Sequence, residues 1–372
     1  MRVRLGEICQ KATSNIAQKD LEGHSGDYPI YGASGFISNV DFYQQENPYI
    51  GVVKDGAGIG RIMKLPAKSS VIGTMQYIIP NENIDISYLT YAMEYMNLSK
   101  YFTGATIPHI YFKDYQKEEL PLSSLDEQRK IAAVLDKVSD LIAKRRQQLD
   151  KLDELVKSQF VEMFGDPIDN TFGWKQALLC EVTSKIGSGA TPRGGKESYQ
   201  AEGISLIRSM NVHDGRFEYK DLAHITEAQA TQLENVTVRE NDVFINITGA
   251  SVARSCIVPR EVLPARVNQH VSIIRCVCSV LHPIFANSMF LNDRFKKQLL
   301  DIGESGGATR QAITKQQLET LTVILPPIEL QQQFAAFVTL TDKSKAAIQK
   351  SMKNLETLKK SLMQTYFGGE NE

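Results

Sequence analysis

Two stretches of the chain place apolar residues at alternating spacings of four and three over an unusual length. The first runs from Asp126 to Phe164 and the second from Ile328 to Phe367, and neither contains a glycine or a proline. This spacing predicts one helix of roughly 38 residues in each stretch, about 57 Å long at 1.5 Å per residue. The apolar seam residues predicted for the two helices are Ile131, Leu135, Val138, Ile142, Leu149, Leu152, Val156, Phe334, Val338, Ile348, Met352, Leu355 and Leu362.

Neither seam can be left in water, and each has a natural partner in the other stretch. We therefore predict that the two helices pack against each other as an antiparallel coiled coil. The polar residues Arg145, Thr341 and Lys345 fall within the seams, where they would lower stability and fix the register. The alternative is that each helix packs only on its own neighbouring domain. Helices of that ordinary kind average about 11–12 residues, so the length favours the coiled coil.

The two helical stretches belong to a longer repeat. The sequence GATIPHI at 104–110 returns as GATRQAI at 307–313, and the alignment continues without a gap to residues 166 and 369. Of its 63 paired positions 15 are identical, whereas composition alone would give about four. A period of 203 residues is too long for a solenoid, so we interpret the chain as a duplicated half-protein.

The segments outside the helices, roughly 1–103 and 174–306, mix strand-like runs with Gly-rich turns. The strand-like runs are 49–53, 76–79, 242–247 and 270–274, and helical patterns follow at 87–100 and 283–300. The two segments correspond loosely, with Gln76-Tyr77 matched to Gln269-His270. We predict an α/β (α+β) fold with pseudo-twofold repetition. Its parts are mixed domains at 1–120 and 167–325 and repeat helices at 121–166 and 326–372.

Composition describes an ordinary globular chain. Net charge is −1 and the isoelectric point is near 6.6, which lacks the basic excess typical of a nucleic-acid binder acting alone. No run of 18 apolar residues is present, and the sequence opens like a strand rather than a signal peptide. The five cysteines are scattered and odd in number, with no CxxC spacing, so we expect reduced thiols in a cytoplasmic protein.

The motifs that suggest catalysis are all incomplete. The loop GSGATPRGGK at 187–196 departs from a phosphate-binding loop, because Ala190 replaces the first glycine and Glu197 replaces the Ser/Thr that would hold Mg²⁺. Asn47-Pro48-Tyr49 lacks the second proline of an amino-methyltransferase motif. The six histidines form no HExxH and no metal-ligand cluster. We therefore predict that the chain has neither a catalytic site nor a metal or cofactor of its own.

Several motifs carry a family resemblance that spans residues 3–369. They are ATPRGGKESY at 190–199, GISLIRSMNV at 203–212, VNQHVSIIR at 267–275 and the helix opening LPPIELQQQF at 325–334. In the first half, YPIYGASGFI at 28–37 and LPLSSLDEQRKIAAVL at 120–135 correspond. The chain resembles the specificity subunit of a Type I restriction–modification system. It departs from the family pattern where Leu-Ser-Ser-Leu replaces Leu-Pro-Pro-Leu at 122–125, and where Leu330-Gln331 replaces Glu-Gln.

The resemblance implies that the mixed domains are target recognition domains, each reading one half of a split, asymmetric double-stranded DNA target. The helices would set the spacing between the halves and dock two modification (methyltransferase) subunits. The resemblance also implies that S-adenosylmethionine is bound by those subunits, and ATP and Mg²⁺ by restriction subunits that translocate and cleave DNA. The chain itself would catalyse nothing.

Candidate DNA-contacting residues follow from the same segments. Gln, Asn and Arg suit bidentate reading of base edges, while Lys, Ser and Thr suit phosphates. In the second domain we select Arg193, Lys196, Arg208, Ser209, Asn211, Arg254, Asn268, Gln269 and His270. In the first domain we select Tyr31, Ser34, Lys54, Arg61, Gln76 and Tyr77. Thr309, Arg310 and Gln311 lie where the second domain rejoins its helix, and either stabilise that junction or contact DNA.

Two other functions fit parts of this pattern. A stand-alone DNA methyltransferase-like enzyme would turn over a methyl donor without partners. A coiled-coil interaction scaffold would use the long helices and bind no nucleic acid.

Overall fold

The computed structural model describes residues 1–56, 58–104, 108–192, 194–304 and 311–368. The chain divides into two compact units. Unit 1 comprises Met1–Gln147 with Ile348–Glu372, and unit 2 comprises Gln148–Ala347. Each unit therefore combines one mixed domain with half of each long helix, α4 (Leu125–Phe164) and α9 (Ile328–Phe367).

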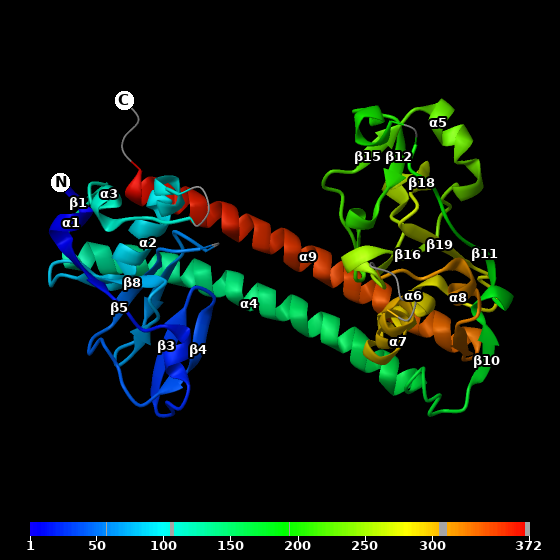
Figure 1. Cartoon of the computed structure of the whole chain (residues 1–372), viewed down its shortest axis with the longest axis horizontal. Helices are drawn as coiled ribbons and strands as arrows, with labels where there is room; N and C mark the ends of the chain where they lie inside the picture. Colours follow the sequence, from blue (N-terminus) through cyan, green and yellow to red (C-terminus); the bar gives the residue numbers. More distant parts are fainter. Residues whose placement is uncertain (57, 105–107, 193, 305–310, 369–372) are drawn as a thin grey trace. The chain divides into compact units, whose positions relative to one another are not determined.

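Unit 1 is built on a four-stranded antiparallel sheet (Figure 1). Its strand order is β2 (Cys9–Thr13), β8 (Met75–Pro80), β5 (Tyr49–Val53), β6 (Ile62–Leu65). A second sheet has the order β4 (Gly35–Val40), β3 (Tyr28–Gly32), β7 (Ser70–Val71), with β3 and β7 parallel. The helices are α1 (Leu5–Ile8), α2 (Ile86–Met96) and α3 (Phe112–Tyr115), and β1 (Arg2–Arg4) pairs with β9 (Glu119–Pro121) beside α4.

Unit 2 repeats this plan. Its four-stranded sheet has the order β11 (Thr183–Ser188), β19 (Val271–Cys276), β16 (Val243–Asn246), β17 (Ser255–Ile257). Its second sheet has the order β15 (Ala223–Ile225), β12 (Ile204–Ile207), β18 (Ala265–Val267), with β12 and β18 parallel. The remaining elements are β10 (Lys175–Leu178) paired with β20 (Thr322–Leu325), β13 (Val212–His213) paired with β14 (Arg216–Phe217), α5 (Glu227–Gln232), α6 (Pro283–Leu291), α7 (Asp293–Glu304) and α8 (Lys315–Glu319).

The two main sheets agree in register as well as in order. In unit 1 Ile50 lies opposite Ile78, and in unit 2 Val243 lies opposite Ile274. The duplication predicted from the helices therefore extends through both domains. The four predicted strands are confirmed as β5, β8, β16 and β19.

One predicted helix is interrupted. The helical pattern at 283–300 consists of α6 and α7, separated at Asn292, whose backbone is extended (φ −58°, ψ 134°). Its side-chain oxygen accepts hydrogen bonds from the backbone N–H groups of Arg294 and Phe295, which caps the second helix. The pattern at 87–100 likewise ends early, because α2 stops at Met96 and a 3₁₀ turn follows.

The long helices are unbroken and pack together as predicted. In unit 1 the first half of α4 contributes Ile131 and Leu135 to a core that includes Phe367 near the end of α9. In unit 2 the ring of Phe160 near the end of α4 lies 5.6 Å from that of Phe334 near the start of α9. These pairings make the helices antiparallel. Every predicted seam residue is buried or half-buried.

The polar seam residues are accommodated by partners. Lys345 donates to Asp153 across the helix pair at 2.6 Å and lies 3.5 Å from Asp342. Thr341 is buried and donates to the carbonyl of Phe337 at 2.9 Å. The ammonium group therefore remains in the seam without an unpaired charge, and its partner on α4 fixes the register in unit 2.

A buried glutamine joins each domain to its long helix. Gln331 is fully buried; its side-chain oxygen accepts from the backbone N–H of His282 at 2.8 Å, and its amide donates to the carbonyls of Val280 and Pro326. Gln128 makes the same set in unit 1, with the backbone N–H of Asp85 at 2.8 Å and two carbonyls. Each glutamine thus bonds the residue that caps α6 or α2, which explains its place in the helix-opening motif.

Candidate nucleic-acid interface

In unit 2 four loops meet at one end of the main sheet. They follow β11, join β16 to β17, precede β19 and return toward β20. Backbone hydrogen bonds tie them together, from Gly189 to Asn268 at 3.1 Å, from Ile247 to His270 at 2.9 Å and from Gly249 to Gln311 at 2.9 Å. We call this the unit 2 edge.

The glycine-rich loop of the edge serves a packing purpose. A Cβ atom on Gly189 would collide with the carbonyl oxygen of Val267. The loop can therefore lie against β18 only because this position lacks a side chain. This accounts for Gly189, one of the glycines that resemble a phosphate-binding loop in the sequence.

A chain of polar side chains runs across the unit 2 edge. The Thr191 hydroxyl is 2.5 Å from the side-chain oxygen of Gln269, whose amide nitrogen is 3.1 Å from Nε2 of His270. The other ring nitrogen, Nδ1, is 2.5 Å from the Thr248 hydroxyl. Gln269 is exposed and His270 half-buried. The network holds an exposed amide and a half-buried imidazole at the edge, and both kinds of group suit base edges.

Two arginines lie on segments bonded to this edge. Arg208 stacks over the ring of Tyr199 at 5.3 Å and donates to the carbonyl of Asp221, while its Nε is buried without a partner. Arg254 is half-buried in the loop between β16 and β17, where its carbonyl accepts from the Asn246 backbone. The side chain of Asn246 in turn donates to the carbonyl of Ser209 at 2.9 Å, which joins the two segments.

Unit 1 forms an equivalent edge. The bond from Gly56 to Pro108 at 3.0 Å corresponds to that from Gly249 to Gln311. Lys54 lies 3.3 Å from Asp55, and the Asp55 carboxylate also bonds Nδ1 of His109. The ring of Tyr111, which is 47% exposed, lies 4.1 Å from the His109 ring. We call this the unit 1 edge.

Three residues of the unit 1 edge, Asp55, His109 and Tyr111, are missing from the sequence-based selection. Their contacts depend on the bridge between Asp55 and His109, which are 54 residues apart. Such a pairing leaves no local pattern. Of the selected residues, Arg61 donates to the carbonyl of Ala33 at 2.6 Å, which joins the exposed turn at Ser34 to the same edge. Tyr31 is half-buried beside Phe36.

Four selected residues are corrected, because the structure buries their side chains. Gln76 is 2% exposed, Tyr77 1%, Asn211 0% and Asn268 5%. Gln76 bonds the Tyr115 hydroxyl, Tyr77 donates to Gln44 at 2.6 Å, and Asn211 donates to the Glu218 carbonyl at 2.9 Å. Asn268 accepts from the His270 backbone at 3.0 Å. These four residues support loops and strands from inside and have no side chain available to a base.

The error at Gln76 and Tyr77 has a geometric cause. The sequence match placed them opposite Gln269 and His270, but backbone bonding gives another correspondence. In unit 1 the backbone N–H of Lys54 donates to the carbonyl of Thr74. The equivalent bond in unit 2 runs from the backbone N–H of Ile247 to the carbonyl of His270. The counterpart of His270 is therefore Thr74, three residues before Tyr77, with which the sequence match had paired it.

The other selected residues lie in or next to segments that the structure does not describe. Arg193, Thr309 and Arg310 are outside the described residues, as is the side chain of Lys196 in its 3₁₀ turn. Gln311 is half-buried and donates to Glu304 at 2.7 Å, so it supports the junction with α7. DNA contact by these residues stays a prediction.

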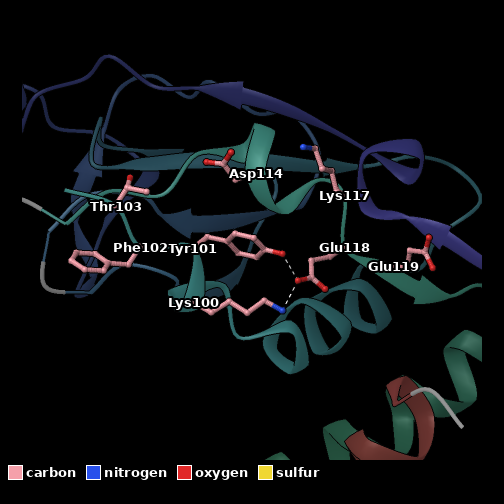
Figure 2. Close-up of a pocket in the computed structure, with 8 residues that line it drawn as sticks. All are labelled: Lys100, Tyr101, Phe102, Thr103, Asp114, Lys117, Glu118 and Glu119. Atoms are coloured by element: carbon pink, nitrogen blue, oxygen red, sulfur yellow. Dashed lines mark hydrogen bonds and ion pairs between the residues drawn. The ribbon is translucent and has the colours of Figure 1, made fainter. Parts of the chain in front are cut away.

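A cavity of about 720 Å³ flanks the unit 1 edge (Figure 2). Lys100 and the Tyr101 hydroxyl converge on Glu118, and burial together with this carboxylate raises the pKa of Tyr101 to about 12. Phe102 is 53% exposed at the cavity, and the neighbouring Thr103 pairs with His109 through two backbone bonds of 2.9 Å. The cavity thus presents an aromatic face close to the edge, and the charges of Lys100 and Glu118 are paired within it.

Three of the five cysteines are buried, whereas Cys180 and Cys278 are exposed. Burial raises the pKa of Cys9, Cys256 and Cys276 to about 12, so these thiols stay protonated and poorly nucleophilic. Over the described ranges, no group of three His, Cys, Asp or Glu residues is placed to hold a metal ion. The helices described are also too short or too polar to cross a membrane.

Comparison with known proteins agrees with this architecture. Residues 1–154 match the family profile described as Type I restriction modification DNA specificity domain. The Type I restriction enzyme MjaVIII specificity subunit of Methanocaldococcus jannaschii is 23% identical, over 99% of this chain and 92% of that protein. The crystal structure of a Type I S subunit from M. genitalium has a TM-score of 0.62 at 14% identity, covering all of this chain and 96% of that one. A chain solved in work on complex assembly and conformational transition of the type I R-M system has a TM-score of 0.53 at 17% identity, covering 100% and 98%.

Proposed function

We propose, on the premise that this chain belongs to the specificity subunits of Type I restriction–modification systems, that each of its two units reads one half of a bipartite DNA target. One observation carries this proposal. The two edges share backbone bonding but present different side chains, such as Asp55 and His109 in one and Thr248 and His270 in the other. Two readers of the same construction with different contents are what an asymmetric target requires.

In unit 2, Gln269 and Arg254 are the side chains we assign to base edges. An amide reads adenine and a guanidinium reads guanine through paired hydrogen bonds in the major groove. Arg208, held over Tyr199, and Ser209 contact the phosphates and fix the register. In unit 1, Arg61 and His109 take the base-reading role, while Lys54 and Ser34 bind phosphates.

The chain selects the DNA sequence, and its partner subunits carry out methylation and cleavage. We propose that two modification subunits dock on the long helices and supply S-adenosylmethionine, and that restriction subunits supply ATP-dependent cleavage with Mg²⁺. A net charge of −1 fits this division, because a chain without basic excess needs partners for part of the phosphate contact. We place the complex in the cytoplasm, where it meets cellular DNA.

The proposal is tested by mapping methylated positions in a genome whose cells express this chain with its modification subunits. We expect one bipartite motif, with unread positions between its halves. A single continuous motif would contradict the two-reader account. Methyl transfer by the purified chain alone would establish the enzyme alternative instead, and absence of any sequence-dependent DNA protection in the assembled complex would establish the scaffold.

The helices are proposed to set the spacing of the two halves. Inserting four residues, about one helical turn, near Lys144–Gln147 should change the number of unread base pairs and leave both half-sites unchanged. Sequencing of the methylated sites measures this directly. Loss of one half-site's identity would contradict the role of the helices as spacers.

A further inference from the structure

Unit 2 contains a groove of about 630 Å³ between its domain and its halves of the long helices. Its floor is apolar, formed by Val156, Phe160, Ile284, Leu291 and Val338. The volume lies within the range of about 300–1,000 Å³ that binding pockets occupy. The groove is separate from the unit 2 edge, and the proposed DNA contacts do not account for it.

The corresponding place in unit 1 is filled by the chain's own side chains. The two buried glutamines show that Asp85 corresponds to His282, so Tyr91 on α2 corresponds to Ser288 on α6. The Tyr91 ring is only 7% exposed, and its hydroxyl bonds Asp136 at 2.7 Å and Ser139 at 3.2 Å on α4. Lys359 on α9 covers that ring at 5.0 Å.

Unit 2 lacks these filling groups. Position 288 is a serine, and Val156 stands where unit 1 has Lys359, as the repeat alignment shows. The counterpart of Ser139 is Asp342, which lines the groove and is 62% exposed. The groove therefore lies where unit 1 has the side chain of Tyr91. The carboxylate of Asp342 lies where Ser139 bonds the Tyr91 hydroxyl in unit 1.

The charges around the groove favour binding of a positively charged segment. Four aspartates line it (Asp153, Asp214, Asp293 and Asp342) against three lysines (Lys157, Lys296 and Lys345), giving 3 − 4 = −1. Each lysine already pairs with one of these carboxylates. The carboxylates of Asp293 and Asp342 are 82% and 62% exposed, so they keep acceptor capacity for an incoming cation.

From this geometry we propose that the unit 2 groove is a docking site for a partner polypeptide that inserts a tyrosine side chain and carries a lysine or arginine beside it. The ring covers Val156 and Val338, the hydroxyl donates to Asp342, and the neighbouring cation meets the free carboxylate oxygens. Within the complex proposed above, the modification subunit is the partner that supplies this segment, and the proposal rests on that function. In unit 1 the corresponding place is filled by Tyr91, so the docking distinguishes the two ends of the duplicated chain.

The test fills the groove as unit 1 fills its own. Ser288→Tyr supplies the ring from within, and Ser288→Ala is the matched control that leaves the groove open. The serine makes no hydrogen bond that holds the fold together in the described structure, so both variants should keep the thermal unfolding midpoint of the parent. Assembly with purified modification subunit is measured by sedimentation velocity. We expect the parent and Ser288→Ala to assemble alike and Ser288→Tyr to assemble at least about tenfold more weakly, a loss of about 1.4 kcal/mol or more.

A second measurement holds even if Ser288→Tyr proves unstable. Tyramine carries a phenol and an ammonium group, and its binding to the parent chain is followed by saturation-transfer NMR. We expect binding that Ser288→Ala retains and that added modification subunit displaces. Undiminished assembly of Ser288→Tyr, or tyramine binding that the modification subunit leaves unchanged, would overturn the docking proposal alone. Failure of the parent chain itself to assemble would instead overturn the proposed function.

Discussion

Unit 1 and unit 2 share their strand order, their register and their buried glutamine, yet they differ in what fills the frame. Unit 2 joins β16 to β19 with a buried ion pair, in which Arg275 donates twice to Asp242 at 2.7 Å. The register places Ile79 at the position of Arg275 in unit 1. The backbone bonds that place each edge are thus common to both units, while the side chains on and behind the edge are not. The two units thus share the backbone hydrogen bonds that position the loops and differ in the side chains that the loops carry.

The largest effect is expected from breaking the ion pair. Asp242 is fully buried, so Arg275→Met leaves an uncompensated charge in the core of unit 2. We expect a loss of about 3–5 kcal/mol in the free energy of unfolding. Urea denaturation followed by the fluorescence of Trp174, the sole tryptophan and a residue of unit 2, measures it. Ile79→Met is the matched control in unit 1 and should cost less than about 1.5 kcal/mol by circular dichroism. Equal losses in the two variants would contradict the difference drawn between the units.

Removal of the buried glutamines should affect both units alike. Gln331→Ala strands one N–H and two carbonyls in unit 2, and Gln128→Ala strands their counterparts in unit 1. Unsatisfied buried groups of this kind lead us to expect a loss of about 2–3 kcal/mol for each variant. Denaturation curves compared at equal protein concentration give the two values. A large loss of stability in one variant and none in the other would show that the glutamine does not stabilise both units in the same way.

A smaller effect is expected at a reading edge. Gln269→Ala removes the exposed amide of unit 2 and should weaken binding of the cognate site by about 1–3 kcal/mol, or roughly 5- to 150-fold. Fluorescence anisotropy of the assembled complex with labelled duplex measures the change. DNA sites altered in the half assigned to unit 2 should bind the variant about as well as the cognate site does. Sites altered in the other half should still bind more weakly than the cognate site. Lys175→Ala, an exposed change in β10, is the control. Equal relaxation at both halves would refute the assignment.

The smallest effect concerns pH. Burial lowers the pKa of His282 below its ordinary value, and its Nδ1 accepts from the backbone N–H of Ile284 at 3.2 Å. The folded state favours the neutral ring, so the associated stability is complete above the unfolded pKa of about 6.5 and is lost as the pH falls below it. Asp85 caps α2 at the same place in unit 1, without a ring to protonate. We expect unfolding of unit 2, followed by Trp174, to be less pH-sensitive between about pH 7 and pH 5 in His282→Asp than in the parent. An unchanged pH dependence would remove His282 as its cause.

The long helices could be predicted from the sequence almost to the residue. Their apolar seams are continuous and are bounded by Pro and Gly, and α9 begins at Ile328 and ends at Phe367, as expected. The centres of the main strands were equally accessible, because buried strands are runs of β-branched and aromatic residues. These are local properties, and the repeat allowed each half to be checked against the other.

The reading edges were only partly predictable. Gln269, His270, Arg254 and Lys54 lie on them, but Gln76 and Tyr77 are buried, because the loop before β8 ends three residues earlier than the sequence match implied. Asp55 and His109 meet through strand pairing across 54 residues, which no spacing rule reports. The glutamine at positions 128 and 331 did carry a sequence pattern. It is a polar identity kept in both copies at the start of an apolar seam, which favours a buried bonding role.

The separate reading of two half-sites is tested most directly by exchanging one reader. Residues 174–306 are replaced by the corresponding segment of another specificity subunit whose target differs in both halves, and methylated sites are mapped in cells that also express the modification subunits. The account predicts a motif in which one half changes to that of the donor, while the other half stays as in the parent. A motif altered in both halves would contradict it.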